Sequence, residues 1–217
     1  MKASTKRKIK QILSIFTRIG LKNKDFSIIS NNCWGGWYYD RYHLSYLTPT
    51  IGLFFPAKDY LKFLSNIHHY LDDCELEKIS FDDSKYQELL LDKEAKGWLL
   101  VPARELIITR LDDIEIVFIH YDSFEDAKSK WDRRKKRINW DNIIYKYNDQ
   151  NGFELEDYEE FKKLNLPNKV FFTSNPKLKN EKGIYYIPKY EKSYGFALDD
   201  IHSSFPFKKY VNNLLKK

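Results

Sequence analysis

The sequence predicts an α/β fold with three layers, in which a mostly parallel or mixed open sheet carries helices on both faces. Between residues 113 and 174, apolar strand-like runs alternate with helical segments in the order β-α-β-α-β. This order favours parallel strands joined by right-handed crossovers. A chain of 217 residues, 42% of them hydrophobic, is long enough for one sizeable core. We therefore expect a basic N-terminal arm over residues 1–24 and a single α/β domain over residues 25–217.

The first half of the chain is predicted to hold two short strands and one long helix. Residues 26–30 form an apolar run typical of a buried strand, and the two glycines that follow predict the end of regular structure. Residues 51–55 form a second apolar stretch, after which proline starts a helix over residues 56–71. Residues 72–95 are polar and acidic, which predicts a surface connection with a short helix.

The second half is predicted to be richer in strands. Ser123 and Asp126 have the spacing of a capping box, which predicts a helix over residues 124–138, and a further helix is expected over residues 155–164. Apolar runs predict strands over residues 97–103, 105–111, 113–121, 142–148, 169–174, 183–188 and 195–200, followed by a terminal helix over residues 207–217.

The positive charge of the chain belongs to its N-terminal arm. Residues 1–24 hold eight basic residues and no acidic residue, which leaves 29 basic and 31 acidic residues in the body. Because the body is nearly neutral and no nucleic-acid-binding motif is present, nucleic acid is not the expected partner. The apolar residues of the arm share one helical face, so this helix can lie on an anionic membrane surface or dock on the domain. No apolar run approaches the length of about 20 residues needed to span a bilayer.

The two cysteines do not indicate a metal or a disulfide framework. Cys33 and Cys74 lie far apart, without a Cys-x-x-Cys or histidine spacing typical of zinc. We therefore expect a cytoplasmic protein with reduced thiols and no cofactor. No Asp-x-Asp triplet ends a predicted strand, since Asp112 and Asp113 precede one, so we also expect no obligatory metal ion.

Polar residues follow four of the predicted strands. Their carboxyl ends would share one edge if all four strands were parallel, and ligands bind at such edges. Asp149 is the preferred catalytic carboxylate because no helix follows it directly, whereas single Asn, Asp or Ser residues often only cap helices or shape turns. Asp122 is a second candidate carboxylate, and His120 is a candidate base or a core imidazole. The polar clusters are Asn31 with Asn32, His120 with Asp122, Asn148 with Asp149, and Ser174 with Asn175.

Two further groups of residues extend the predicted binding site. Gly35 and Gly36 would let the backbone approach a phosphate, and Trp37 would stack on a sugar or base or pin the loop to the core. Arg133 or Arg134, if turned toward the sheet edge, would bind a diphosphate or an anionic sugar. The predicted substrate-binding residues are Asn31, Asn32, Gly35, Gly36, Trp37, Arg133, Arg134, Asn148, Ser174 and Asn175.

Four stretches in order resemble the bacterial family known as domain of unknown function 1919, whose members are often labelled exopolysaccharide or capsular polysaccharide biosynthesis proteins. The stretches are FSIISNNCWGGWYY, TPTIGLFFPAKDYLKFL, IHYDSFEDAKSKWDRRKKRINWDN and YNDQNGF. The resemblance covers residues 26–174 and leaves the arm and the tail outside. It implies a cytoplasmic α/β protein that acts in surface glycan assembly, and it transfers no catalytic role to any residue.

These observations together predict a transferase in bacterial surface polysaccharide biosynthesis. A glycosyltransferase that uses a nucleotide-sugar donor and a glycan acceptor is the leading hypothesis. One alternative is a polysaccharide O-acyltransferase or esterase with Ser30 or Cys33 as nucleophile and His120 as base. The other alternative is a protein that binds glycans without catalysis.

Overall fold

The computed structural model describes residues 16–188 and 205–214. Most of the basic arm and the strand expected over residues 195–200 lie outside these ranges. Within the described part of the arm, residues 16–18 are helical, and Phe16 and Ile19 are both 65% exposed.

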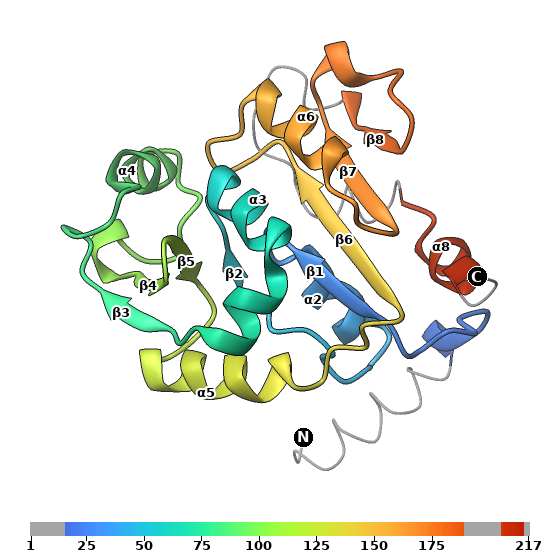
Figure 1. Cartoon of the computed structure of the whole chain (residues 1–217), viewed down its shortest axis with the longest axis horizontal. Coiled ribbons are helices and arrows are strands. Elements are labelled where there is room, and N and C mark those ends of the chain that lie inside the picture. Colours follow the sequence, from blue (N-terminus) through green and yellow to red (C-terminus); the bar gives the residue numbers. More distant parts are fainter. Residues whose placement is uncertain (1–15, 189–204, 215–217) are drawn as a thin grey trace.

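The centre of the fold is a parallel sheet of four strands in the order β1-β6-β7-β8 (Figure 1). All three neighbouring pairs are parallel, and Ser30 at the end of β1 lies opposite Lys146 of β6. The carboxyl ends of β1, β6 and β7 therefore share one edge. The strands are β1 (Ser27–Ser30), β6 (Ile143–Asn148), β7 (Lys169–Thr173) and β8 (Ile184–Tyr186).

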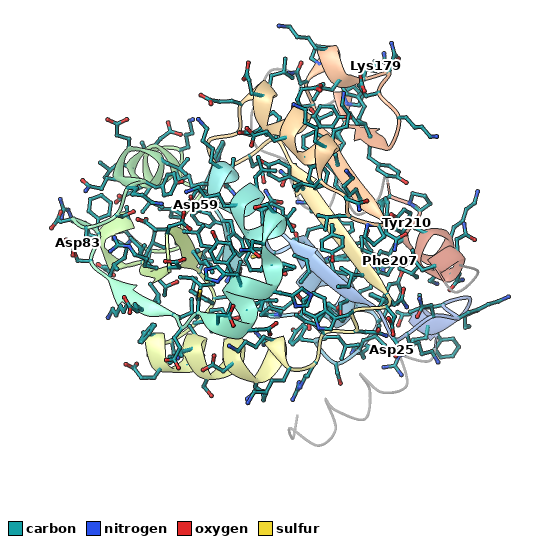
Figure 2. All side chains as sticks on the ribbon, in the orientation of Figure 1. Asp25, Asp59, Asp83, Lys179, Phe207 and Tyr210 are labelled. Carbon is teal, nitrogen blue, oxygen red and sulfur yellow. The ribbon has the colours of Figure 1, made fainter. Side chains whose placement is uncertain are left out.

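A second sheet of four strands is antiparallel, in the order β2-β5-β4-β3. It adjoins the first sheet where the backbone N–H of Phe55 donates to the carbonyl of Asn31 at 3.0 Å. Asp59, labelled in Figure 2, is buried and accepts a hydrogen bond from the backbone N–H of Glu115 at 2.7 Å, which joins a helix to this sheet. The strands are β2 (Leu53–Phe54), β3 (Glu77–Ile79), β4 (Ile107–Leu111) and β5 (Ile114–Phe118).

Helices cover both faces of the parallel sheet, which confirms the predicted α/β class (Figure 1). Successive side chains of a strand point to opposite faces, so Ile29 belongs to one hydrophobic core and Ile28 to the other. The first core is covered by α3 (Ala57–Ser65), α5 (Phe124–Lys135) and α6 (Leu155–Lys163), and the second by α2 (Trp34–Arg41) and α8 (Phe207–Leu214).

Helix α8 ties the end of the described chain to its beginning. Phe207, labelled in Figure 2, stacks on Tyr38 of α2 with ring centroids 3.7 Å apart. Asn212 accepts from the backbone N–H of Lys22 at 2.8 Å and of Asn23 at 3.2 Å. These contacts dock residues 22 and 23 on the domain, whereas the predicted arm helix lies mostly outside the described residues.

Several predicted elements are wrong in type or extent. Residues 97–103 form no strand, because Pro102 opens the short helix η2 (Ala103–Glu105). The long predicted helix is interrupted after α3 and resumes as a π-helix, η1 (His69–Asp73). The polar connection contains β3 as well as the expected helix, α4 (Gln87–Ala95). Another short helix is η3 (Pro176–Leu178). No helix of residues 16–188 or 205–214 is long and apolar enough to cross a membrane.

Candidate functional site

The structure brings three of the four predicted polar clusters together at the edge of the parallel sheet. Asn32 follows β1, and its Nδ2 donates to Oδ1 of Asn148, the last residue of β6, at 3.2 Å. Asp149 follows β6 and accepts from the backbone N–H of Ser174, which follows β7, at 2.9 Å. The fourth cluster lies elsewhere, because the strand before His120 belongs to the antiparallel sheet.

Lys146 is the centre of this edge, and the sequence analysis missed it. Its side chain is fully buried, and Nζ donates to Oδ1 of Asn31, Asn32 and Asn148 at 3.0, 2.9 and 2.7 Å. Three acceptors match the three donors of an ammonium group. Burial nevertheless lowers the pKa of Lys146 well below its ordinary value, and the nearby Asp149 opposes this shift. The signal that could have revealed it is a lysine within residues 143–147, a strand-like run whose other members are isoleucines and tyrosines.

Asn32 also starts helix α2. Its Oδ1 accepts from the backbone N–H of Trp34 at 3.2 Å, which satisfies one of the free donors at the beginning of the helix. Its Nδ2 reaches Oε1 of Gln150 at 3.1 Å, on the loop that follows β6. Asn31 and Asn148 are fully buried, and in the described part of the chain their Nδ2 atoms have no hydrogen-bond partner. The two amides therefore carry unused donors at the strand ends.

Asp149 is half-buried at the end of β6 and linked to the end of β7. Its Oδ2 accepts from Thr173 Oγ1 at 2.6 Å, in addition to the Ser174 contact. Burial raises the pKa of Asp149, and these hydrogen bonds oppose the shift. Its Oδ1 is buried without a hydrogen-bond partner among the described residues. The carboxyl group thus has one oxygen held in place and one that is free to accept a proton.

A cleft of about 450 Å³ opens beside the beginning of α2. It lies between α2, the loop before β2, the residues after β5, and helix α5. Its lining combines two basic side chains, one carboxylate, one thiol and three aromatic rings with apolar and backbone surface. The lining residues are Cys33, Gly36, Trp37, Asp40, Tyr46, Ile51, Gly52, His120, Tyr121, Lys130 and Arg134.

Arg134 is the most tightly held cation of the cleft. It is only 7% exposed, and Nη1 donates to the Tyr121 hydroxyl at 2.7 Å, while the guanidinium carbon lies 4.7 Å from the centre of the Tyr46 ring. Lys130 lies over the Tyr121 ring at 5.1 Å. The neighbouring Arg133 is exposed and does not line the cleft. Of the two arginines predicted for the site, only Arg134 therefore faces the cleft.

The prediction that Gly35 and Gly36 end regular structure and form a phosphate-binding loop is wrong. Gly35 and Gly36 do not form a loop, because both lie in the first turn of α2. A Cβ on Gly35 would come within 2.9 Å of Ile28 Cγ2, and a Cβ on Gly36 would contact Ile51 at 3.6 Å. Gly35 lets the helix approach β1 closely, which is a packing role. Gly36 is buried and lines the cleft.

The aromatic residues of the same stretch divide between the core and the cleft. Trp34, Tyr38 and Tyr39 are buried in the second core. Trp37 is half-buried and lines the cleft, where Arg41 lies 4.9 Å from the centre of its ring. Trp37 is therefore the aromatic residue of α2 that a ligand in the cleft can reach.

Among residues 16–188 and 205–214, no activating base contacts either candidate nucleophile. Ser30 is fully buried, and its hydroxyl donates to Asn32 Oδ1 at 3.3 Å. Burial raises the pKa of Cys33 to about 11, and Sγ donates to the carbonyl of Leu53 at 3.7 Å. His120 is exposed at the rim of the cleft. At neutral pH the thiol is therefore protonated, which disfavours nucleophilic attack.

Two other residues predicted for the site, Asp122 and Asn175, do not line the larger cleft. Asp122 is exposed and does not line the cleft; the adjacent Ser123 caps α5 by accepting from the backbone N–H of Asp126 at 3.1 Å. Asn175 caps η3 by accepting from the backbone N–H of Lys177 at 3.0 Å. Neither contact requires a ligand.

A smaller cleft of about 200 Å³ lies next to the strand-end cluster, where Asp149 and Gln150 line it. Cys33, next to Asn32, lines the larger cleft. The hydrogen bond between Asn32 and Gln150 thus connects a neighbour of the larger cleft with the wall of the smaller one. The remaining lining residues are Leu89, Asp92, Lys93, Lys96, Trp98, Asn151, Gly152 and Phe153.

Gly52 shapes the larger cleft, and its replacement by alanine is expected to lower the free energy of unfolding by about 2 kcal/mol. Its φ of +69° is unfavourable for other residues, and a Cβ would lie 3.0 Å from the Tyr121 ring and 3.2 Å from His120 Cβ. Gly97→Ala is the matched control. Gly97 has a similar φ of +68°, but a Cβ added there would meet no atom of the described residues within 4 Å. Urea denaturation should give the control a loss of only about 1 kcal/mol. Equal losses would show that the contact with the cleft wall has no energetic effect.

Comparison with known proteins places the chain among related sequences. A family model described as "Domain of unknown function (DUF1919)" matches residues 4–215. An uncharacterized protein of Haemophilus influenzae is 30% identical over 172 residues, which cover 79% of this chain and 72% of the relative. The match confirms the family resemblance of residues 26–174 and extends it into the arm and the tail.

Proposed function

The chain belongs to the family described as domain of unknown function (DUF1919), and from this relation and the geometry of the two clefts we propose that it is a transferase of bacterial surface polysaccharide assembly. The proposed reaction is glycosyl transfer from a nucleotide sugar to a glycan acceptor. The proposed location is the cytoplasm, with the basic helix predicted within residues 1–24 at the anionic inner face of the cell membrane.

The composition of the larger cleft carries this proposal. Arg134 and Lys130 supply positive charge for a diphosphate, and the beginning of α2 adds the positive end of a helix dipole. Trp37 supplies an aromatic surface for a base or a sugar ring. A site with fixed cations stabilises the charge that develops on a leaving diphosphate, which is a main requirement of glycosyl transfer without a metal.

The smaller cleft supports a place for the acceptor. Trp98 and Phe153 offer aromatic surface, and Asp149 offers a carboxyl oxygen that has no partner among the described residues. In the proposed mechanism Asp149 accepts the proton of the acceptor hydroxyl as that oxygen attacks the sugar carbon. The bond between the sugar and the diphosphate then breaks, and Arg134 stabilises the leaving group.

The acyltransferase alternative has less support from the geometry. Ser30 is enclosed in the polar cluster, and the Cys33 thiol is protonated at neutral pH, because burial raises its pKa to about 11. Neither residue contacts His120 through a hydrogen bond in the described ranges. Non-catalytic glycan binding would use the same clefts, so an assay of sugar transfer is needed to distinguish it from catalysis.

Binding of uridine or guanosine diphosphate tests the proposal directly. We expect at least one of them to raise the melting temperature of the protein, and Arg134→Lys to weaken its binding about tenfold, because lysine cannot form the paired hydrogen bonds of a guanidinium group. Isothermal titration calorimetry measures the affinity. Arg133→Lys is the matched control and should bind like the natural chain, since Arg133 is exposed away from the cleft. No binding of either diphosphate, or equal effects of the two variants, would contradict the proposal.

A further inference from the structure

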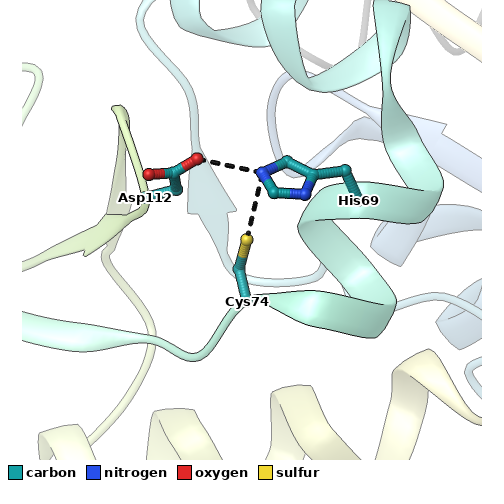
Figure 3. Close-up of side chains that lie close together, drawn as sticks. All are labelled: His69, Cys74 and Asp112. Carbon is teal, nitrogen blue, oxygen red and sulfur yellow. Dashed lines mark hydrogen bonds and ion pairs between the residues drawn. The ribbon is translucent and has the colours of Figure 1, made fainter.

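A second cluster of reactive side chains lies away from both clefts. His69 is the first residue of η1, Cys74 follows that helix, and Asp112 lies in the turn between β4 and β5 (Figure 3). His69 and Cys74 are half-buried, and Asp112 is exposed. Asp112 precedes β5 and His120 follows it, so the cluster and the larger cleft lie at opposite ends of this strand. The proposed transfer reaction makes no use of the cluster.

The three side chains point at one another. His69 Nε2 lies 3.4 Å from Cys74 Sγ and 2.9 Å from Asp112 Oδ2, as the dashed lines in Figure 3 show. One ligand atom from each residue lies within 4.8 Å of the other two. Ligand atoms around a tetrahedral zinc ion are roughly 3.3 to 3.6 Å apart, given bond lengths of about 2.0 to 2.3 Å. The observed separations therefore need to change by only a few tenths of an ångström around the imidazole.

The other nitrogen of the imidazole is also held by a carboxylate. His69 Nδ1 lies 3.5 Å from Asp73 Oδ2. Histidines that bind metals through one ring nitrogen almost always donate from the other to a carboxylate, a carbonyl or a water, which fixes the ring and its tautomer. Asp73 therefore occupies the position of an orienting residue, and Nε2 remains directed at Cys74 and Asp112.

The backbone of this region is also unusual. η1 is a π-helix, a rare form whose hydrogen bonds join residues five apart and which occurs frequently at functional sites. His69 and Cys74 are five residues apart, so this winding brings the start and the end of the turn together. Asp112 has a φ of +57°, a left-handed conformation that the tight β4–β5 turn requires. Both segments are thus shaped so that their polar side chains meet.

We propose that His69, Cys74 and Asp112 form a binding site for a zinc-like divalent cation, with a fourth coordination position left to water. Thiolate, imidazole and carboxylate are together the ligands of zinc, whereas magnesium and calcium prefer oxygen alone. Binding converts the Cys74 thiol to a thiolate and displaces the proton that His69 Nε2 shares with Asp112, and both protons pass to the solvent. The ion would connect η1 to the β4–β5 turn, 43 residues further along the chain. This proposal departs from the expectation of no metal, which considered cysteine and histidine spacings and the absence of an Asp-x-Asp triplet at a strand end.

Titration of the metal-free full-length protein with Co²⁺ tests the site. We expect a thiolate-to-cobalt charge-transfer absorption that Zn²⁺ abolishes by displacement. Cys74→Ser should remove the absorption, and His69→Ala should weaken Zn²⁺ binding at least tenfold, about the smallest loss that changes at a metal centre usually produce. Cys33→Ser and His68→Ala are the matched controls, because each replaces the other cysteine or the adjacent histidine, and both should retain the absorption.

Asp73→Asn keeps all three ligand residues, so this variant tests the site without removing a ligand and is not expected to unfold the protein. It should weaken Zn²⁺ binding roughly 10- to 100-fold while the far-ultraviolet circular dichroism stays unchanged. The proposal is overturned if the natural chain shows no charge-transfer absorption, or if Cys33→Ser rather than Cys74→Ser removes it. Equal Zn²⁺ affinity of the natural chain and His69→Ala would also overturn it.

Discussion

Asp149→Asn is expected to lower the rate of sugar transfer roughly 10²- to 10⁴-fold, the usual contribution of a general base, while leaving the protein folded. The asparagine oxygen can still accept from Thr173 and from the Ser174 backbone, so the link between β6 and β7 is kept. Release of nucleoside diphosphate from a nucleotide sugar, with water as acceptor, measures the rate.

The pKa of Asp149 separates a catalytic role from a structural one. Burial raises this pKa, so the carboxyl group's contribution to stability is present at low pH and is lost as the pH rises through the folded-state value. At neutral pH, Asp149→Asn should therefore leave the free energy of unfolding unchanged or higher. A variant that lost both stability and activity would indicate that Asp149 holds the fold.

Asp157→Asn is the matched control for this experiment. Asp157 is a buried aspartate whose pKa, like that of Asp149, is raised by burial, but it accepts from the backbone N–H of Glu154 at the start of α6. Its replacement should cost at most about 1 kcal/mol of stability, as for a helix cap, and should not change the transfer rate. Equal rates in the two variants would remove Asp149 from the mechanism.

Lys146→Met is expected to lower the free energy of unfolding by about 2 to 3 kcal/mol in urea denaturation. The loss comes mainly from Asn31, because Lys146 is the only donor that the structure gives its buried Oδ1 in the described part of the chain. A buried polar atom without a partner costs about 1 to 3 kcal/mol. Asn32 and Asn148 each keep another donor, Trp34 N–H and Asn32 Nδ2 respectively.

Two comparisons test this assignment. Lys169→Met also removes three hydrogen bonds, from Nζ to carbonyls of residues 161, 162 and 164, but at the partly exposed end of α6. Its cost should be about 1 kcal/mol or less, because water can replace the ammonium group there. Adding Asn31→Leu to Lys146→Met should recover part of the loss, which a double-mutant cycle measures. A cost for Lys146→Met no larger than that for Lys169→Met would contradict the central role of Lys146.

The sequence is a good guide to strands with long apolar runs. β6 and β7 and the helix between them lie where alternation and periodicity predict them. The apolar run over residues 97–103 is a different case, because Pro102 has no backbone N–H to donate and Trp98 and Leu100 stay exposed. Hydrophobicity alone does not show which strand a segment pairs with, because the partner can lie far away along the chain. The division of the strands into two sheets depends on these pairings.

The candidate site was predictable only in part, for a related reason. Asn32, Asn148 and Asp149 could be located because they follow buried strands, and strand ends converge in a parallel sheet. Lys146 could not be placed by that rule, since it lies within a strand and is held by side chains 114 and 115 residues away. Gly35 was misjudged because a glycine that allows close packing of a helix against a strand resembles one that shapes a loop. Spacing along the chain does not distinguish these cases.

The docking of α8 on β1 and α2 has a consequence for folding during synthesis. Trp34 and Tyr38 leave the ribosome well before Phe205, Phe207 and Val211, which complete the same core. Until α8 emerges, one face of the parallel sheet therefore lacks part of its covering. Transiently exposed aromatic surface of this kind promotes aggregation, so we expect chaperones that bind aromatic residues to protect the chain during that interval.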